Sequence, residues 1–203
     1  MSILGKYALL EAMNEPQLSQ RLVVTPIFVE DQVGPGSIDI RLGHEFITTR
    51  RGNLQVIDPG QIKEEQRRRY EHRNYVELHQ TFVLHPNELV LAATMEWFRL
   101  PAHLAGYVTS RSSWGRAGLI VATAVAVHPG FAGCITLELV NTGEVPFVLY
   151  PGLRVAQFVV FSCEQGDAYK GAFATQPGPS TSHSKMLEER DRQFWTKKPE
   201  EKT

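Results

Sequence analysis

Cysteine is scarce in this chain, because among 203 residues only Cys134 and Cys163 occur. Two cysteines cannot build a disulfide framework, and they are too few for a cysteine-rich metal site. We therefore expect two buried, reduced thiols.

Long apolar runs are missing as well. The longest, from Ala117 to Val127, is interrupted by Thr123 and falls short of the ~18 residues that indicate a membrane span. Neither a signal-peptide core nor a cleavage site follows Lys6 near the N-terminus. These absences predict a cytoplasmic protein without a membrane partner.

The chain has no excess of charge of one sign. Lysine plus arginine come to 21 and aspartate plus glutamate to 22, a formal net charge of -1. Such a chain has no global field that would gather nucleic acid, so a polyanionic ligand must be met by a local site. The basic run Arg67-Arg68-Arg69 lies in the mixed-charge segment from Lys63 to Arg73. We interpret that segment as a solvated loop or helical excursion and expect no nucleic-acid partner.

Most catalytic signatures are absent too. The sequence contains no Walker loop, GxGxxG, GxSxG or HExxH motif, and its seven histidines are scattered. A zinc deaminase needs a His-x-Glu element followed by Pro-Cys-x-x-Cys, and neither is present. We therefore expect no zinc and no protein-bound metal.

Short segments rich in valine, isoleucine and aromatic residues dominate what is present, and turns with glycine or proline separate them. This pattern predicts a mainly β fold of the jelly-roll, sandwich or barrel type. The expected strands are Val23–Val29, Ser37–Leu42, Phe46–Thr49, Tyr75–Leu78, Thr81–Leu84, Leu89–Thr94, Ala105–Val108, Leu119–Val127, Cys134–Asn141, Phe147–Tyr150 and Val155–Phe161. Helical spacing of apolar residues predicts one short helix from Ile3 to Asn14, closed by Pro16.

The composition changes after Gly166. We expect one β domain over residues 1–165 and a C-terminal tail over residues 166–203, first rich in glycine, proline, serine and threonine. The segment from Lys185 to Lys198 predicts a polar helix. A tail of this kind usually packs on a neighbouring subunit or folds over a site.

Two predicted turns carry candidate binding residues. In Ser110–Arg116, two arginines and three hydroxyls crowd together, as recognition of a triphosphate requires, although a capped turn with exposed arginines explains the same residues. In Ala126–Gly133, glycines allow the backbone to approach a ligand, and Phe131 can stack on a sugar or base. An ordinary hairpin turn with a half-buried Phe131 is the alternative.

Glu138 is the candidate for acid–base chemistry. Strand alternation places it on one face with Thr136 and Val140, so an apolar residue shares the face of this carboxylate. Partial desolvation would raise its proton affinity and let it act as base and acid in turn near neutral pH. A solvent-facing glutamate on an edge strand is the alternative.

Together these elements resemble the dCTP deaminase branch of the dUTPase superfamily. They follow the order and near spacing of that family over residues 37 to about 161. The matching segments are Ser37–Gly43, Leu84–Leu89, Leu100–Ala102, Ser110–Gly118, Thr123–Ala124, Pro129–Phe131, Gly133–Glu138 and Tyr150–Arg154.

The resemblance implies a dUTPase-like distorted jelly roll, or β-clip, with a short N-terminal helix and a C-terminal tail or helix. It implies a homotrimer whose active sites are shared between neighbouring subunits. It also implies hydrolysis of the 4-amino group of dCTP to dUTP and ammonia without a catalytic metal. Mg²⁺ would be bound through the nucleotide triphosphate.

The resemblance also assigns roles to residues of the site. Glu138 would take a proton from the water that attacks C4 of cytosine and return protons to the ring and the leaving group. The Ser112 hydroxyl and the Ala124 carbonyl would hold that water. Arg116 would neutralise phosphate or stabilise charge in the site, and both jobs stay open.

The substrate-binding residues implied by the resemblance surround this centre. They are Arg111, Ser113, Thr123, His128, Phe131, Lys170 and Gln176. Arg111 and Ser113 would meet the phosphates, and Phe131 would lie against the deoxyribose and exclude a ribose 2′-hydroxyl. Gln176 would contact phosphate as the tail closes.

The chain also departs from the family pattern. His128 stands where dUTPases, and most dCTP deaminases, carry an aspartate that helps to position water in dUTP hydrolysis. Imidazole does not replace a fixed negative charge, which disfavours a dUTPase or a bifunctional enzyme, but it can still meet the sugar 3′-hydroxyl. Ala172-Phe173 replaces the family's Lys-Tyr pair, so the phosphate-binding cation is missing unless Lys170 supplies it. The stretch between Gly118 and Thr123 is one residue shorter than the family's.

Two alternatives to the deaminase remain. The first is a related enzyme that hydrolyses the phosphoanhydride of dUTP or dCTP, alone or together with deamination. The second is a catalytically silent nucleotide-binding trimer, suggested by the altered turn and tail.

Overall fold

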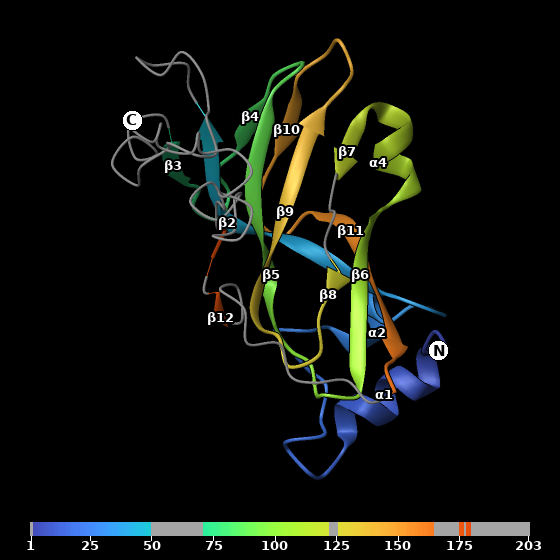
Figure 1. Ribbon diagram of the computed structural model, residues 1–203. Helices are drawn as coiled ribbons and strands as arrows, with labels where there is room; N and C mark the ends of the chain where they lie inside the picture. The colour runs from blue at the N-terminus through green and yellow to red at the C-terminus, as the bar shows by residue number, and fades with distance from the viewer. Residues whose placement is uncertain (1, 50–70, 122–125, 165–174, 177, 180–203) are drawn as a thin grey trace, which may run out of the picture.

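The computed structural model describes residues 2–49, 71–121, 126–164, 175–176 and 178–179. Strands dominate these residues, and the helices among them are short, which confirms the mainly β class (Figure 1). The helices are α1 (Lys6–Asn14), α2 (Val29–Gln32) and α4 (Ser112–Ala117). The strands are β1 (Val23–Thr25), β2 (Ile38–Thr49), β3 (Glu71–Tyr75), β4 (Phe82–Leu84), β5 (Leu89–Arg99), β6 (Leu104–Ser110), β7 (Leu119–Val121), β8 (Ala126–Val127), β9 (Ala132–Asn141), β10 (Phe147–Leu149), β11 (Arg154–Ser162) and β12 (Thr175–Gln176).

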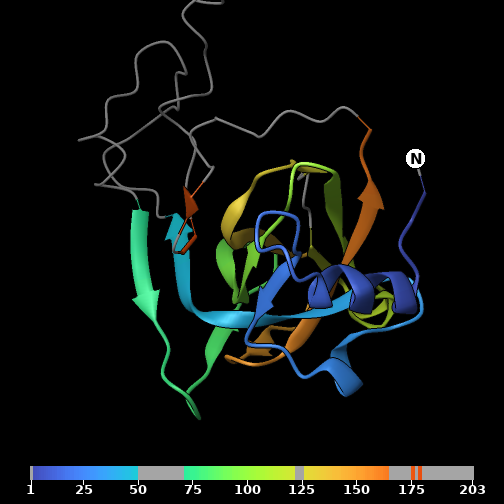
Figure 2. The same cartoon turned by 90° about the horizontal axis from the view of Figure 1, so that it is seen from below.

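Most strands join one curled sheet in the order β12-β9-β5-β2-β11-β6-β8. The long strand β2 links its two halves, because residues Ile38 to Arg41 pair with β11 and residues Leu42 to Thr48 pair with β5. Seen from below, the strands curl around a common interior, and β3 stands at the rim beside the end of β2 (Figure 2). Strands β4 and β10 form a separate pair.

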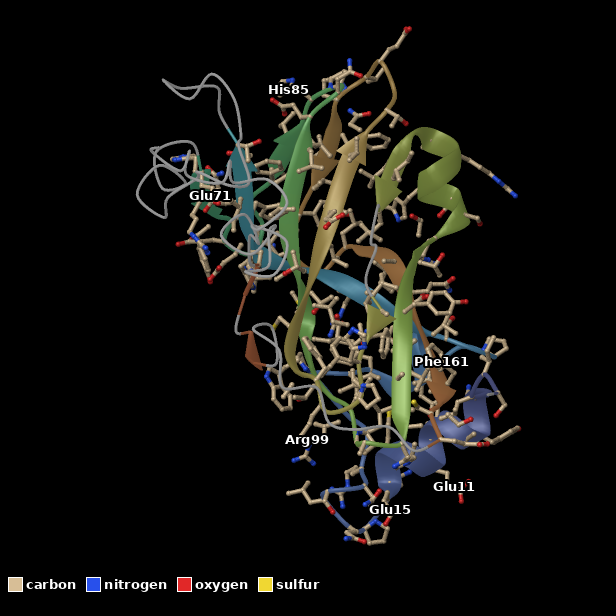
Figure 3. All side chains as sticks on the ribbon, in the orientation of Figure 1. Glu11, Glu15, Glu71, His85, Arg99 and Phe161 are labelled. Carbon is tan, nitrogen blue, oxygen red and sulfur yellow. The ribbon has the colours of Figure 1, made fainter. Side chains whose placement is uncertain are left out.

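The interior of this curl is the hydrophobic core. Its largest fully buried side chains include Phe46, Phe98 and Phe158, and Phe98 meets Phe158 edge to face at a centroid distance of 5.1 Å. Leu9 of α1 is fully buried and belongs to the same core, so α1 closes one end of the curl. Glu15 and Arg99 project at that end and His85 at the opposite end (Figure 3).

The structure corrects several expected boundaries in the first half of the chain. Val23–Val29 is a strand only to Thr25, and Val29 begins α2. The two expected strands Ser37–Leu42 and Phe46–Thr49 are one strand, because an irregularity in the pairing with β5 absorbs the turn-like Gly43-His44-Glu45.

Other boundaries shift for similar local reasons. The strand expected at Tyr75–Leu78 lies earlier, at Glu71–Tyr75, where polar side chains face solvent on the rim. Its first residues belong to the charged segment expected as a loop or helix, whose residues 63–70 lie outside the described part. The strand expected at Leu119–Val127 is two strands, β7 and β8, with different partners. The tail helix expected over residues 185–198 lies outside the described residues.

Both cysteines are free thiols, but they are half-buried rather than buried as expected. Burial, with smaller contributions from the negative charges of Glu96 and Glu45, raises the pKa of the Cys134 thiol. That thiol therefore stays protonated near neutral pH, as expected for an unreactive cysteine. No helix in the described residues is long and apolar enough to cross a membrane.

Candidate active site

Glu138 lies in the middle of β9, where it pairs with β5, and the pairing of β7 on the other side of β9 ends at the next residue, Leu139 (Figure 1). Its partner across the β5 pairing is Leu91, and Val140 follows it on the same face of β9. Burial among these groups raises the pKa of the Glu138 carboxyl above its ordinary value of 4.5. The expected partial desolvation is confirmed, and the alternative of a solvent-facing glutamate is wrong because the Glu138 side chain is half-buried.

The alternation expected for β9 is also confirmed. Ile135, Leu137 and Leu139 are buried in the core, while Thr136, Glu138 and Val140 are half-buried on the other face. The core side fixes the register of β9, since a slip of one residue would turn Glu138 into the core.

A bulge in β5 anchors β9 three residues before Glu138. Between Ala93 and Trp97 the pairing is interrupted, so the amide of Ile135 lacks a backbone partner there. The buried Thr94 hydroxyl fills this place, accepting from the Ile135 amide at 2.9 Å and donating to the Glu96 carbonyl at 2.7 Å.

The turn expected at Ser110–Arg116 is a short helix, α4. Its first turn closes when the Trp114 and Gly115 amides donate to the Arg111 carbonyl, at 3.0 and 3.2 Å. Its end is set by Gly118, whose φ of +100° is in the left-handed region. Sequence reasoning missed the helix because it has little apolar periodicity and contains a glycine.

Helix α4 presents the candidate side chains outward. Ser112, Ser113 and Arg116 are exposed. Trp114 anchors the helix instead, since its indole Nε1 donates to the Arg154 carbonyl at 2.8 Å. The hydroxyls and Arg116 are therefore free of the core and accessible to a ligand.

Arg111 is held by Asp39 of β2. Its Nη2 lies 3.7 Å from the Asp39 carboxylate, and Arg154 approaches the same oxygen at 3.9 Å. Gln157 donates to the other carboxylate oxygen at 3.0 Å. Two arginines over one carboxylate leave a net positive charge, which suits an anionic ligand. The segment Ser37–Gly43, which contains Asp39, was matched to the family in the sequence, but the sequence pattern did not predict the contact between Asp39 and Arg111.

The turn between β8 and β9 carries His128 and Phe131. Gly130 has a φ of +79°, as the glycine-dependent turn requires. His128 is exposed, whereas Phe131 is 9% exposed and packs in the core, so it is more buried than the alternative of an ordinary hairpin turn supposed. The backbone of Phe131 is fixed as well, since its carbonyl accepts from the Leu100 amide at 2.9 Å.

The tail meets this turn through β12. Thr175 pairs with Ala132, and Gln176 pairs with Gly133, in a parallel arrangement at the edge of β9. The backbone of Gln176 therefore lies beside the first residues of β9, which directly follow Phe131. Thr123, Ala124 and Lys170 lie outside the described residues.

A buried polar network that sequence patterns did not predict joins α2, β2 and β5. Arg41 Nε lies 2.6 Å from Glu96 Oε1, and the Arg41 amide donates to the other carboxylate oxygen at 2.9 Å. Gln32 donates to Glu96 at 2.9 Å as well. Alternating strand patterns predict such charges on the surface, so only their spatial pairing reveals the network. Among the described residues no group of three or more His, Cys, Asp or Glu side chains could hold a metal ion.

A family model described as dCTP deaminase-like matches residues 3–163 of the chain. The chain belongs to the dCTP deaminase-like family. The resemblance found in the sequence is thereby confirmed at the level of the family, whose members are enzymes.

Curated relatives agree with this assignment. A dCTP deaminase of Natronomonas pharaonis is 40% identical over 164 residues, which cover 75% of this chain and 81% of that protein. A protein of Methanobrevibacter smithii named "dCTP deaminase, dUMP-forming" is 40% identical over 160 residues, covering 78% and 79% of the two chains.

A solved structure supports the fold. The 2′-deoxycytidine 5′-triphosphate deaminase of Agrobacterium tumefaciens superposes with a TM-score of 0.58 at 24% identity, over 78% of this chain. The match covers 47% of the solved chain, so this chain spans about half of its length. At this identity the likeness shows the fold, and it agrees with the expected dUTPase-like jelly roll.

Proposed function

We propose that this protein hydrolyses the 4-amino group of dCTP, with dUTP and ammonia as products. The observation that carries the proposal is the placement of Glu138, a half-buried carboxylate with a raised pKa on an apolar sheet face, in a chain of this family. The raised pKa makes this carboxylate a stronger base than an exposed glutamate, which suits a residue that must accept a proton and then return it.

The chemistry consumes one water per dCTP. Glu138 accepts a proton as the water oxygen bonds to C4 of cytosine, and it passes a proton to the ring nitrogen. Glu138 then takes a second proton, from the new hydroxyl on C4, and passes it to the amino nitrogen. The bond from C4 to that nitrogen breaks, ammonia departs, and C4 becomes the carbonyl of the uracil ring. The Ser112 hydroxyl and the Ala124 carbonyl hold the water in place.

The arginines at and within α4 bind the triphosphate or stabilise charge near it. Arg111, oriented by Asp39, and the exposed Ser113 bind phosphate oxygens, and Arg116 either binds phosphate or stabilises charge in the site. Mg²⁺ enters with the substrate as the complex of the triphosphate.

The remaining candidates bind the rest of the nucleotide. His128 meets the sugar 3′-hydroxyl, Phe131 limits the space at the 2′ position, and Thr123 contacts the substrate. Gln176 and Lys170 of the tail reach the phosphates as the tail folds over the site. The pairing of β12 with Ala132 and Gly133 supports this proposal, because it brings the tail beside the turn of His128.

We further propose a homotrimer in the cytoplasm with sites completed by neighbouring subunits. Leu89 and Ile120 pair with Val140 on the face of Glu138, and their side chains are 44% and 41% exposed. A subunit that covered them would remove water from the surroundings of Glu138. Light scattering tests the trimer, and a monomer at micromolar concentration would contradict it.

A second candidate is a bifunctional enzyme that releases dUMP and pyrophosphate. It is favoured by the name "dCTP deaminase, dUMP-forming" given to several relatives at 34–44% identity. His128 disfavours it, since the turn lacks a fixed negative charge for a second water. Pyrophosphate among the products would decide for this candidate.

The experiment that tests the deaminase proposal compares two glutamine variants. Glu138→Gln should abolish ammonia release from dCTP while leaving the oligomer intact, because an amide cannot accept the proton. Glu144→Gln is the matched control, since Glu144 is exposed six positions further along the chain, and it should keep full activity. Retained activity in Glu138→Gln would overturn the proposal.

A further inference from the structure

The Ser110 hydroxyl is bonded twice to one residue of β7. Its Oγ accepts a hydrogen bond from the Val121 amide at 3.0 Å and donates one to the Val121 carbonyl at 3.3 Å. Ser110 is the last residue of β6, and Val121 is the last residue of β7. Val121 is 6% exposed, so water replaces these two bonds poorly.

These bonds connect different parts of the curled sheet. Strand β6 pairs with β8 and β11, whereas β7 pairs with β9. The amide and carbonyl of one strand residue point to the same side. Ser110 therefore bonds Val121 on the side away from β9, where a further strand would otherwise bond.

The end of β7 lies next to the catalytic candidate. Val121 is paired with Leu139, the neighbour of Glu138 in β9. The start of β7 is held separately, because the Gly118 carbonyl accepts from the amide and the hydroxyl of Thr142, both at 2.9 Å. Loss of the Ser110 hydroxyl would thus release the end of β7 beside Glu138 and leave its start attached.

We propose that Ser110 is a positioning residue for the deamination, because its hydroxyl holds the end of β7 against β9 and so fixes the surroundings of Glu138. The inference rests on the proposed function. Ser110 acts through Val121 and Leu139 and needs no contact with the substrate.

Kinetics separate this role from a merely structural one. Ser110→Ala should lower kcat for dCTP by about tenfold to a hundredfold with little change in KM. Water entering beside Glu138 should lower the pKa of its carboxyl, so the acid limb of the kcat profile should move to lower pH. Ser110→Thr keeps a hydroxyl and should restore most of kcat. Ser162→Ala is the matched control, since Ser162 also ends a strand and its hydroxyl contacts Ser2 instead.

A direct titration makes the test independent of activity. With ¹³C-labelled glutamate, the Glu138 carboxyl signal is identified by its loss in Glu138→Gln and titrated by NMR without substrate. Its midpoint should fall in Ser110→Ala. If that variant does not fold, Ser110→Cys replaces it, because a thiol of similar size forms weaker hydrogen bonds and should shift both readouts in the same direction.

The outcomes also separate this inference from the proposed function. A wild-type protein that releases no ammonia would overturn the proposed function, and the NMR comparison would still show whether Ser110 controls Glu138. A folded Ser110→Ala or Ser110→Cys with wild-type kcat, or with an unchanged Glu138 titration, would overturn the positioning role.

Discussion

Arg111 and Asp39 form an ion pair that joins the start of α4 to β2, with Nη2 of Arg111 3.7 Å from Oδ2 of Asp39. Arg111 also donates to the Arg154 carbonyl from Nη1 at 3.5 Å. The guanidinium is thereby held from two of its nitrogens, with 35% of the side chain still exposed. This geometry depends on the fork of arginine, which lysine lacks.

Replacement of Arg111 should therefore weaken binding of the triphosphate. Arg111→Ala should raise KM for dCTP by about tenfold to a hundredfold, the value of a charge-assisted hydrogen bond, with a smaller effect on kcat. Arg111→Lys should recover only part of the loss. Steady-state kinetics check this, with Arg21→Ala as control, because Arg21 donates to the Glu15 and Pro16 carbonyls just after α1, away from the candidate site. An unchanged KM in Arg111→Ala would remove Arg111 from the phosphate site.

The buried pair of Arg41 and Glu96 should dominate the polar contribution to stability. Glu96 is 0% exposed, and Glu96→Gln would leave the Arg41 charge buried without a counter-charge. The free energy of unfolding should drop by about 3–5 kcal/mol, as for other broken buried pairs. Glu45→Gln is the control, since Glu45 is half-exposed and 3.9 Å from Arg73, and it should change stability by about 1 kcal/mol or less. Denaturant unfolding measures both, and equal effects would contradict the account.

On the acid side, kcat should begin to fall at a higher pH than the pKa of an ordinary glutamate would give. Glu138 must be ionised to accept a proton from water, and burial raises its pKa above 4.5. As pH falls through this raised pKa, kcat should decline with a slope of one proton. A kcat profile flat down to pH 4.5 would show that Glu138 is not the base.

Stability should respond to the same carboxyl with a defined sign. The folded state binds the Glu138 proton more tightly than the unfolded state, because the folded pKa is raised. Its contribution is fully present below the ordinary pKa and is lost as pH rises through the folded pKa. Glutamine does not ionise, so the Tm of Glu138→Gln should exceed the wild-type Tm increasingly from acid to neutral pH. The effect should be small because Glu138 is part-exposed, and a constant difference across pH would contradict it.

Sequence patterns predicted the elements around Glu138 well. The alternation in β9 placed Ile135, Leu137 and Leu139 in the core, and one buried face is sufficient to fix a strand. Patterns failed where the local signal was weak, as at α4, a short helix with exposed residues on most sides.

The contacts that orient the site could not be predicted from the sequence. Asp39 and Arg111 are far apart in the chain. Ser110 and Val121 are 11 positions apart, too far to be joined by a single turn. The first pair forms because β2 passes from one half of the sheet to the other. The second forms because the ends of β6 and β7 lie close together. Periodicity describes which face a residue occupies and carries no information on which polar group it meets there.

The most direct test of the central claim is product analysis by mass spectrometry after incubation of the protein with dCTP and Mg²⁺, with Glu138→Gln alongside. We predict dUTP with one equivalent of ammonia from the wild type and unchanged dCTP from the variant. Unchanged dCTP from the folded wild type, or equal dUTP from both proteins, would contradict it.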